Sequence, residues 1–391
     1  MGRIIVFTGK GGVGKTSVAG SHALRAAKEG LKTLIISTDM AHNLSDLFEI
    51  KLGNEVTEVY PKLFALEIDP NHEMQRHYGT IKEAIDKMLF SQKEMKLNED
   101  ELEDLVVIPG MEEFFSLLRI QEIYEKNEYD IIIVDCAPTG ETLSLLKFPE
   151  LFSWYMEKLF PVGKVALKVL RPISKHAFKL ELPDSDTLND IEKLYINLNK
   201  LQSLLKDRTI CSIRLVTIPE KMVVEETKRN YMYLNLYNFN VDGIFINRII
   251  PDDVEDSFFE EWKRLQKEYL EELKMVFGSI PIYFIKWYNK DINGIEALES
   301  IVQDSLVDEH LLEVLKTTAN EVFEKTKTGY KLTVYVPFVS KQTFDLFQSP
   351  TDLIIKVGNF KRNIPLPLVL RKYQVAGAKF EEGKLHISFS E

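Results

Sequence analysis

The chain has only two cysteines among its 391 residues, Cys136 and Cys211. Their wide separation excludes a disulfide framework and a paired-cysteine zinc site within the chain, so we expect no zinc and a reducing compartment. No apolar run reaches the roughly 18 residues that would indicate a membrane span. The first ten residues read as a strand and a loop instead of a secretory signal. These absences favour a cytoplasmic protein.

The chain has no excess of positive charge: 60 acidic residues outnumber 49 basic ones, and the formal net charge is -11. Such a balance argues against nonspecific binding to nucleic acid, where the phosphates need a field of the opposite sign. The hydrophobic content of 45% and charged content of 28% are ordinary for a soluble globular protein. At this length, two domains are expected.

Short apolar runs rich in β-branched residues alternate with longer helical patterns over the first three quarters of the chain. The runs are RIIVFT from Arg3, TLIIST from Thr33, LFALEID from Leu63, YDIIIVD from Tyr129, TICSIRLVT from Thr209, VDGIFIN from Val241 and SIPIYF from Ser279. Strands that are buried on both faces by crossover helices have this continuous apolar character. We therefore predict a doubly wound, mostly parallel α/β sheet.

The alternation stops after residues 308–325, whose leucines and Val322 recur at helical spacing and predict a last helix. From Tyr330 onward the segments are short, rich in strand formers and separated by Gly, Pro or Asn, which is typical of an antiparallel β-sandwich. The predicted organisation is an α/β domain over residues 1–325, with a helical insertion at about 148–208, and a β-sandwich over 326–391.

A glycine-rich loop follows the first predicted strand. The sequence GKGGVGKT fits the pattern GxxxxGK[ST] between a strand and a helix, where backbone N–H groups can surround phosphate oxygens. Lys15 is expected to reach the terminal phosphates and Thr16 to bind Mg²⁺. The alternative is a merely flexible turn. The predicted residues of the ATP site are Gly9, Lys10, Gly11, Gly12, Val13, Gly14, Lys15, Thr16 and Ser17.

Two aspartates follow predicted strands at the edge of the sheet where ligands bind in doubly wound folds. Asp135 ends the run IIIV and has the position of an acid that holds Mg²⁺ through water, while Asp39 is the better candidate for positioning the attacking water and lies close to the metal. Each could instead cap a helix.

With these motifs in order, the chain resembles the ArsA family of P-loop ATPases, which includes an arsenite-pump ATPase and a targeting factor for tail-anchored membrane proteins. The resemblance implies a homodimer in which Lys10 reaches the partner's nucleotide; the alternative is a solvated lysine. It also implies that Asp39 orients catalytic water, and that Asn247 reads adenine, unless Asn247 merely ends a surface strand. The remaining implied residues are Arg248 and Pro281 around the nucleotide and Asn43, Pro138, Thr139 and Gly140 in the switch loops.

Departures from the family pattern bear on the cargo. The paired-cysteine zinc motif of the eukaryotic targeting factors and any set of three arsenite-binding cysteines are missing. As(III) seeks thiolates, so these absences disfavour a metalloid pump. Met40 replaces a usual proline and Glu141 a usual histidine, which affects the switch loops more than ATP binding.

A candidate client surface lies between residues 151 and 180, where six Lys or Arg accompany Glu157 alone. Phe152, Tyr155, Met156 and Leu159 recur at helical spacing and would form one apolar face. Such a face suits a hydrophobic protein segment, and the lysines suit a membrane surface. Plain core or dimer packing is the alternative.

The last 65 residues or so resemble a small heat-shock protein, or α-crystallin, domain, through GNFKRNIPLPLVL and AGAKFEEGKLHISF. A generic β-sandwich is the alternative. The favoured hypothesis for the whole chain is an ATP-driven chaperone or targeting factor for hydrophobic segments. The rivals are an arsenite or antimonite pump subunit, a positioning ATPase of the ParA and MinD kind, and an interaction module that binds nucleotide without hydrolysing it.

Overall fold

The computed structural model describes residues 2–39, 43–73, 75–76, 111–137, 185–315, 319–327, 329–338, 344–358 and 360–390. Several predicted residues lie outside these ranges: Pro138, Thr139 and Gly140 of the second switch, and Phe152, Tyr155, Met156 and Leu159 of the client surface. Their roles stay predictions.

An eight-stranded sheet forms the centre of the first domain. Its strands are β1 (Arg3–Thr8), β2 (Thr33–Ser37), β3 (Thr57–Tyr60), β4 (Leu63–Glu67), β5 (Ile131–Asp135), β6 (Cys211–Thr217), β7 (Val241–Ile249) and β8 (Ile282–Lys286), in the order β3-β4-β2-β5-β1-β6-β7-β8. All neighbours are parallel except β3 and β4. The predicted fold class is confirmed, and each of the seven apolar runs overlaps a strand. The edge strand β3 was not predicted, because TEVY is short and only partly buried.

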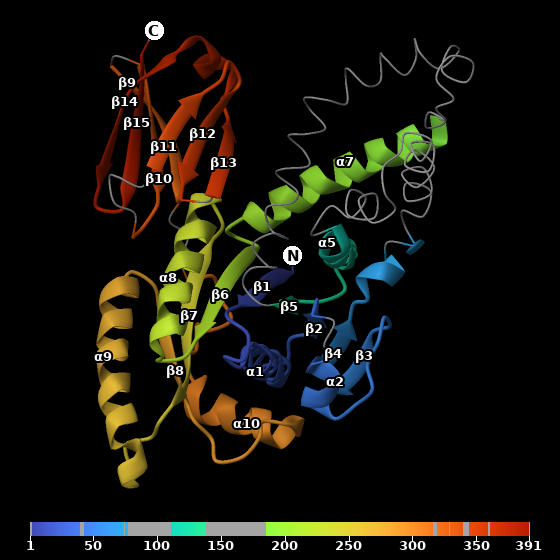
Figure 1. Ribbon diagram of the computed structural model, residues 1–391. Helices are drawn as coiled ribbons and strands as arrows, with labels where there is room; N and C mark the ends of the chain where they lie inside the picture. The colour runs from blue at the N-terminus through green and yellow to red at the C-terminus, as the bar shows by residue number, and fades with distance from the viewer. Residues whose placement is uncertain are drawn as a thin grey trace, which may run out of the picture.

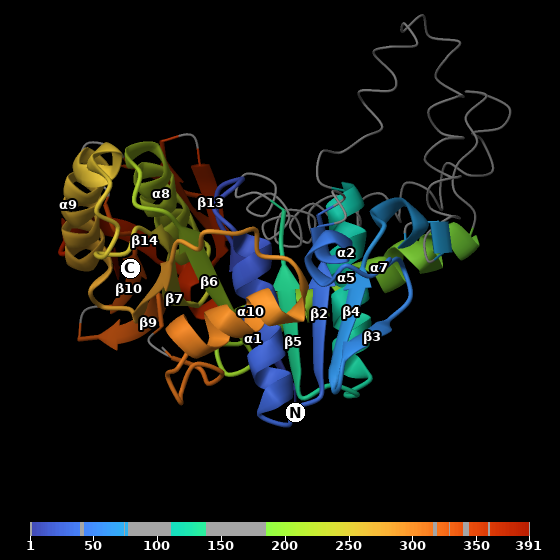
Figure 2. The ribbon, with the colours of Figure 1, turned by 90° about the horizontal axis from the view of Figure 1, so that it is seen from below.

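Helices cover both faces of this sheet (Figures 1 and 2). One face carries α1 (Lys15–Lys28), α2 (Asn43–Phe48) and α10 (Gly294–Ser305); the other carries α5 (Met111–Glu125), α7 (Ser185–Lys206), α8 (Lys221–Leu236), and α9 (Glu260–Phe277) after the short η2 (Ser257–Phe259). Alternate residues of β1 explain why both faces are apolar, because Ile4 joins one buried cluster and Ile5 the other. Among the described residues, no helix combines the length and apolar character needed to cross a bilayer.

Two antiparallel sheets form the C-terminal part. One has the order β14-β15-β10-β9 and the other β11-β12-β13. Their bounds are β9 (Glu321–Thr326), β10 (Gly329–Tyr335), β11 (Phe344–Gln348), β12 (Asp352–Val357), β13 (Phe360–Pro365), β14 (Gln374–Glu381) and β15 (Lys384–Ser390), with η3 (Leu368–Lys372) between β13 and β14. Leu332 and Ile387 from the first sheet and Ile355 from the second are fully buried, as the predicted β-sandwich requires.

The predicted helix over residues 308–325 is wrong. Residues 308–315 form turns and irregular chain, and Glu321–Thr326 is strand β9, paired with β10. The helical spacing was misleading, because Leu311 and Leu312 fill the core beneath the large sheet, whereas Val322 belongs to the other domain. The antiparallel sheet therefore begins at Glu321, before the predicted boundary at residue 325.

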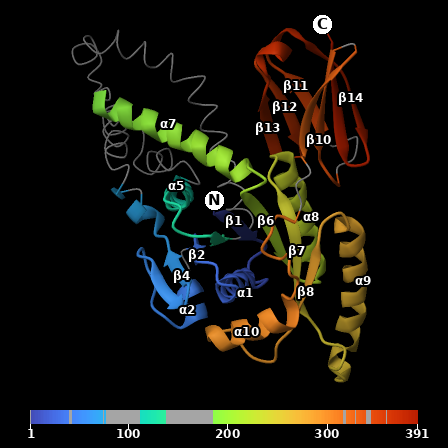
Figure 3. The same cartoon turned by 180° about the vertical axis from the view of Figure 1, so that it is seen from behind.

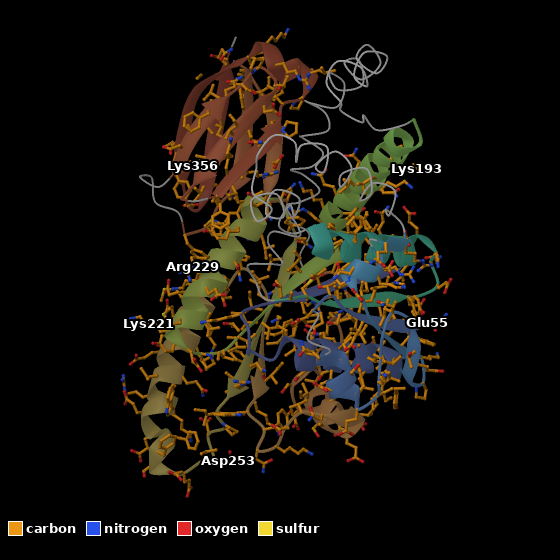
Figure 4. The ribbon with its side chains drawn as sticks, turned by 45° about the vertical axis from the view of Figure 1, so that its right-hand side comes forward. Glu55, Lys193, Lys221, Arg229, Asp253 and Lys356 are labelled. Carbon is orange, nitrogen blue, oxygen red and sulfur yellow. The ribbon has the colours of Figure 1, made fainter. Side chains whose placement is uncertain are left out.

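The β-sandwich packs on the C-terminal end of α8 (Figures 1 and 3). Just beyond that end, the Tyr237 hydroxyl donates to the Lys361 carbonyl at 2.9 Å, and Asn320 Nδ2 donates to the Phe239 carbonyl at 2.8 Å. Buried residues of both parts belong to one hydrophobic cluster. Along the outer side of α8, Lys221 lies far from the sandwich and Arg229 nearer to it, with Lys356 of the sandwich beyond (Figure 4).

Candidate nucleotide site

The loop between β1 and α1 has a backbone that only glycine allows at several points. Gly12 and Gly14 have positive φ angles of 80° and 89°. A Cβ atom at Gly9 would lie 2.2 Å from the Val216 carbonyl oxygen, and one at Gly14 would lie 2.3 Å from Asn247 Nδ2. The loop is therefore pressed between β6 and β7, and it leads directly into the N-terminus of α1. Backbone N–H groups at such a helix start are suited to phosphate.

The predicted P-loop residues take these places. Gly9, Lys10, Gly11, Gly12, Val13 and Gly14 form the loop, and Lys15, Thr16 and Ser17 form the first turn of α1. Lys15 is only 8% exposed, and its Nζ lies 3.5 Å from the Lys10 carbonyl oxygen. A buried ammonium group facing the inside of the loop is placed for an anion.

Asp135 lies at the carboxyl end of β5 with 1% exposure. The Thr16 hydroxyl donates to its carboxylate, but within the described part of the chain Oδ1 has no hydrogen-bond partner. Burial raises the pKa of Asp135 to about 7; the Thr16 bond and the Lys15 charge lower it, and the Asp39 charge raises it further. A buried carboxylate with an unused oxygen is a good ligand for a hard cation.

Mg²⁺ fits this arrangement of donors. It usually keeps several waters and takes one or two protein oxygens beside the phosphates of the nucleotide. Thr16 and Asp135 supply two oxygens, and the described residues contain no group of three or more His, Cys, Asp or Glu that could hold a metal alone. The pair therefore suits a hydrated ion that is shared with a nucleotide.

Asp39 follows β2, directly beside β5. The register pairs Ser37 with Asp135, so the chain leaves both strands at the same edge. Asn43 Nδ2 donates to Asp39 Oδ2 at 3.1 Å, and the backbone N–H of Asp39 donates to Ser37 Oγ at 3.2 Å. The Asn43 bond orients the Asp39 carboxylate at the same edge as Asp135, close enough for its charge to act on that residue. Sequence analysis missed Ser37, which gave no signal beyond its place before Asp39.

Lys10 points away from the interior of its own loop. Its side chain is 38% exposed, and Nζ lies 3.9 Å from Glu226 Oε2 on α8. The two lysines of the loop thus have different surroundings, since Lys15 is buried. Glu226 lies on α8, more than 200 residues after Lys10, so the sequence alone does not show that it faces the P-loop.

Asn247 lies near the carboxyl end of β7, beside the loop. Its Nδ2 donates to the Val13 carbonyl at 2.9 Å, and its Oδ1 accepts the Arg248 backbone N–H at 2.9 Å. Arg248 has a positive φ of 56° and an exposed side chain. The structure therefore brings Asn247 to the P-loop, with Arg248 next to it.

Pro281 does not lie at the edge of the sheet where the P-loop and Asn247 meet. It precedes β8, and its carbonyl accepts the Ile244 backbone N–H at 3.0 Å. Because β7 and β8 are parallel, Pro281 lies at the amino end of β8, about 15 Å along the strand from the edge where the P-loop lies. Its placement does not support a role in an adenine pocket.

An aromatic cavity of about 290 Å³ lies at the same edge, around Arg248. Its walls come from the end of β7, from the segments that follow β6, β7 and β8, and from η2 and α9: Ile218, Pro219, Glu220, Arg248, Ile250, Phe258, Phe259, Trp262, Gln266 and Trp287. Aromatic walls suit the flat face of a nucleobase. Trp287 follows the predicted strand SIPIYF, and this position could have indicated that it lines a ligand site at the carboxyl edge of the sheet.

Comparison with known proteins agrees with this geometry. A family model described as "Anion-transporting ATPase" matches residues 2–307, and a model described as "HSP20-like domain found in ArsA" matches residues 327–389. The first model covers the whole large sheet and all the residues named at the site. The second covers most of the β-sandwich.

Several curated proteins resemble the chain over most of their length. It is 34% identical over 390 residues to the "Putative arsenical pump-driving ATPase" of Chlorobaculum tepidum, covering 99% of this chain and 96% of that protein. A similarly named protein of Aquifex aeolicus is 31% identical, covering 99% and 100%. The "ATPase GET3A" of Arabidopsis thaliana is 30% identical over 343 residues, covering 82% and 93%.

Proposed function

This chain belongs to the ArsA family of ATPases and carries that family's HSP20-like domain, and from this premise we propose that it works as a dimeric switch that captures and releases hydrophobic protein segments. ATP hydrolysis follows from the family. The observation that carries the proposal is the meeting of the P-loop, Asp135 and Asp39 at one edge of the sheet.

In this proposal the P-loop amides and Lys15 bind the phosphates of ATP. Thr16 and Asp135 would hold Mg²⁺, which when bound neutralises charge on the phosphates. Asp39 accepts a hydrogen bond from the attacking water and orients it. The Asn43 amide fixes the Asp39 carboxylate, so any movement of α2 would move the water-orienting group.

The base is proposed to occupy the aromatic cavity. Asn247 and Arg248 lie between the P-loop and that cavity, so one ligand can reach from the phosphate loop to the aromatic walls. The Asn247 amide already bonds the Val13 carbonyl through one N–H, and an amide nitrogen has a second N–H to offer a ring nitrogen.

Lys10 is proposed to act on the partner subunit's nucleotide. Its ion pair with Glu226 is 3.9 Å long and partly exposed, and such pairs contribute at most about 1 kcal/mol. Closing a dimer could therefore separate Lys10 from Glu226 at small cost, while Lys15 stays with its own loop.

A hydrophobic client is favoured over a metalloid, although two of the relatives bear arsenical-pump names. Cys136 and Cys211 are both buried, at 1% and 2% exposure. Burial raises the pKa of Cys211 to about 12, so that thiol stays protonated. With two cysteines in the whole sequence, one chain cannot supply three thiolates to As(III). The client surface proposed for residues 151–180 supports the protein-segment alternative.

The test is affinity capture with the Asp39→Asn variant in the presence of ATP. We expect ATP to be bound but hydrolysed at least about 100-fold more slowly, and proteins with apolar helices to be enriched over capture with ADP. Asp345→Asn, an exposed aspartate of β11, is the matched control and should hydrolyse ATP normally. Stimulation of the wild-type ATPase by arsenite, without nucleotide-dependent capture, would instead establish the pump subunit.

A further inference from the structure

The turn between β13 and β14 holds two large apolar side chains in solvent. Leu368 is 79% exposed and Val369 is 53% exposed. Leu366 and Leu370 on either side are buried, at 1% and 2%. Two leucines thus anchor the turn in the sandwich while the pair between them points outward, so the exposure is not that of a frayed segment. We call Leu368 and Val369 the apolar tip.

Hydrogen bonds hold this turn in shape. The Leu366 backbone N–H donates to the Thr351 carbonyl at 2.8 Å, which ties the turn to the start of β12. Arg371 Nε donates back to the Leu366 carbonyl at 3.2 Å, and the Leu370 N–H donates to the Pro367 carbonyl at 2.8 Å. A turn closed at both ends cannot fold Leu368 and Val369 back onto the domain.

The tip lies at the end of the sandwich that faces away from the ATPase domain. At the near end of β13, Lys361 accepts the bond from Tyr237 beside α8, whereas the tip follows the far end of the strand. β14 starts opposite Ser390, so the tip is at the same end as the chain's C-terminus (Figure 1). A convex tip in this position can approach a flat surface without hindrance from the ATPase domain.

Charge around the tip differs from that of the protein as a whole. Two cations, Arg371 and Lys372, follow the tip after Leu370, and both side chains are exposed. Asp352, a carboxylate at the same end of the sandwich, is 6% exposed and accepts hydrogen bonds from the Thr351 and Ser349 hydroxyls. An apolar pair followed by two cations is complementary to an anionic lipid surface.

We propose that this tip docks the protein on anionic membranes, with Leu368 and Val369 entering the boundary of the acyl chains and Arg371 and Lys372 facing the lipid phosphates. A protein partner fits less well, because a stable protein interface buries about 800 Å² on each side and needs a matching shape, whereas two side chains on a convex turn provide neither. A fluid bilayer needs no matching shape. Two side chains and two charges give weak, reversible binding, which suits a protein that visits membranes. This docking is independent of the proposed client capture.

The test is co-sedimentation of the full chain with phosphatidylcholine vesicles that contain or lack phosphatidylglycerol. We expect binding to the anionic vesicles that falls as salt rises. The double variant Leu368→Ser with Val369→Ser should lower that binding about tenfold. Arg371→Gln with Lys372→Gln should lower it severalfold and remove the preference for anionic lipid. Phe347→Ser is the matched control, since Phe347 is 55% exposed on β11 and not on the turn.

All four substituted side chains of the turn are exposed, so ATPase activity should stay at the wild-type value, and so should the Tm of the serine variant. The glutamine variant loses the Arg371 bond to the Leu366 carbonyl and should show a small fall in Tm. The proposal is overturned if the wild-type chain does not bind anionic vesicles. It is equally overturned if the Leu368→Ser, Val369→Ser variant binds as well as wild type, or if Phe347→Ser loses as much binding as the tip variants. Retention of a soluble protein by the tip, without vesicle binding, would also overturn it.

Discussion

Two buried aspartates at opposite ends of the large sheet differ in how their oxygens are used. Asp242 lies at the amino end of β7 with no exposure, and Asp135 lies at the carboxyl end of β5. In Asp242, Oδ1 accepts from Arg214 Nε at 3.3 Å, and Oδ2 accepts from Arg3 Nη2 and the Leu315 backbone N–H, both at 3.1 Å. In Asp135, Oδ1 accepts no bond from the described residues.

The difference separates a structural carboxylate from one that is prepared for a ligand. Arg214 also donates to the Leu311 carbonyl at 2.6 Å, so the Asp242 cluster fixes residues 311–315, where the chain leaves the ATPase domain. Within the described ranges, Asp135 accepts a hydrogen bond from Thr16, and its Oδ1 has no partner. What distinguishes Asp135 is therefore the combination of an oxygen without a partner among the described residues and a position beside the P-loop residue Thr16.

The substitution Asp242→Asn tests whether the Asp242 carboxylate is structural. Arg3 and Arg214 would lose the carboxylate with which both form ion pairs, and breaking a buried charge network in this way typically destabilises a protein by about 3–5 kcal/mol. We expect a loss of that size in the free energy of unfolding, measured by urea denaturation, with ATP turnover per folded molecule close to wild type. A loss below about 1 kcal/mol would show that the cluster is not structural.

The opposite pattern is expected for Asp135→Asn. Removing the carboxylate should reduce Mg²⁺-dependent ATP hydrolysis by about 100-fold or more, because the charge that would hold the metal is gone. Phosphate release at increasing Mg²⁺ concentrations measures the effect, with Asp345→Asn as the control. Stability should not fall as it does in Asp242→Asn. An ATPase rate within twofold of wild type would remove Asp135 from the site.

The sequence predicted the carboxyl edge better than the amino edge, for physical reasons. Continuous apolar runs are a local signal of buried parallel strands, and a glycine-rich loop between a strand and a helix has few other uses. Asp135 could therefore be predicted from its place after IIIV. Asp242 gave no such signal, because its partners Arg3 and Arg214 are remote in sequence and meet only when β1, β6 and β7 are adjacent.

The two wrong predictions and the missed ion pair also come from contacts between residues that are remote in sequence. The spacing of Leu311 and Val322 mimicked a helix, although the two side chains serve different cores. Pro281 was predicted to lie at the adenine, but being next to a strand does not say at which end of it a residue lies. The ion pair between Lys10 and Glu226 joins residues more than 200 positions apart, which no local pattern can indicate.

The smallest expected effect is the pH dependence that Asp135 gives to stability. Its pKa is raised from 3.8 to about 7 by burial, so between these values the folded protein keeps a proton that the unfolded chain has released. The stability of the nucleotide-free protein should therefore fall as the pH rises from about 4 to 7 and then level off, by on the order of 2–4 kcal/mol from this group alone. Asp135→Asn should lose this contribution and be the more stable protein at pH 8.

Urea denaturation between pH 5 and 8 compares the two proteins directly. Binding of Mg²⁺ and nucleotide should release up to about one proton near pH 6 in wild type and fewer in Asp135→Asn, because a cation at the Asp135 carboxylate favours its charged form. Equal pH slopes for both proteins would mean that the Asp135 carboxylate is already ionised in the empty site. Its charge would then be stabilised within the protein, as that of Asp242 is. Only the effect of each substitution on ATP hydrolysis would then distinguish Asp135 from Asp242.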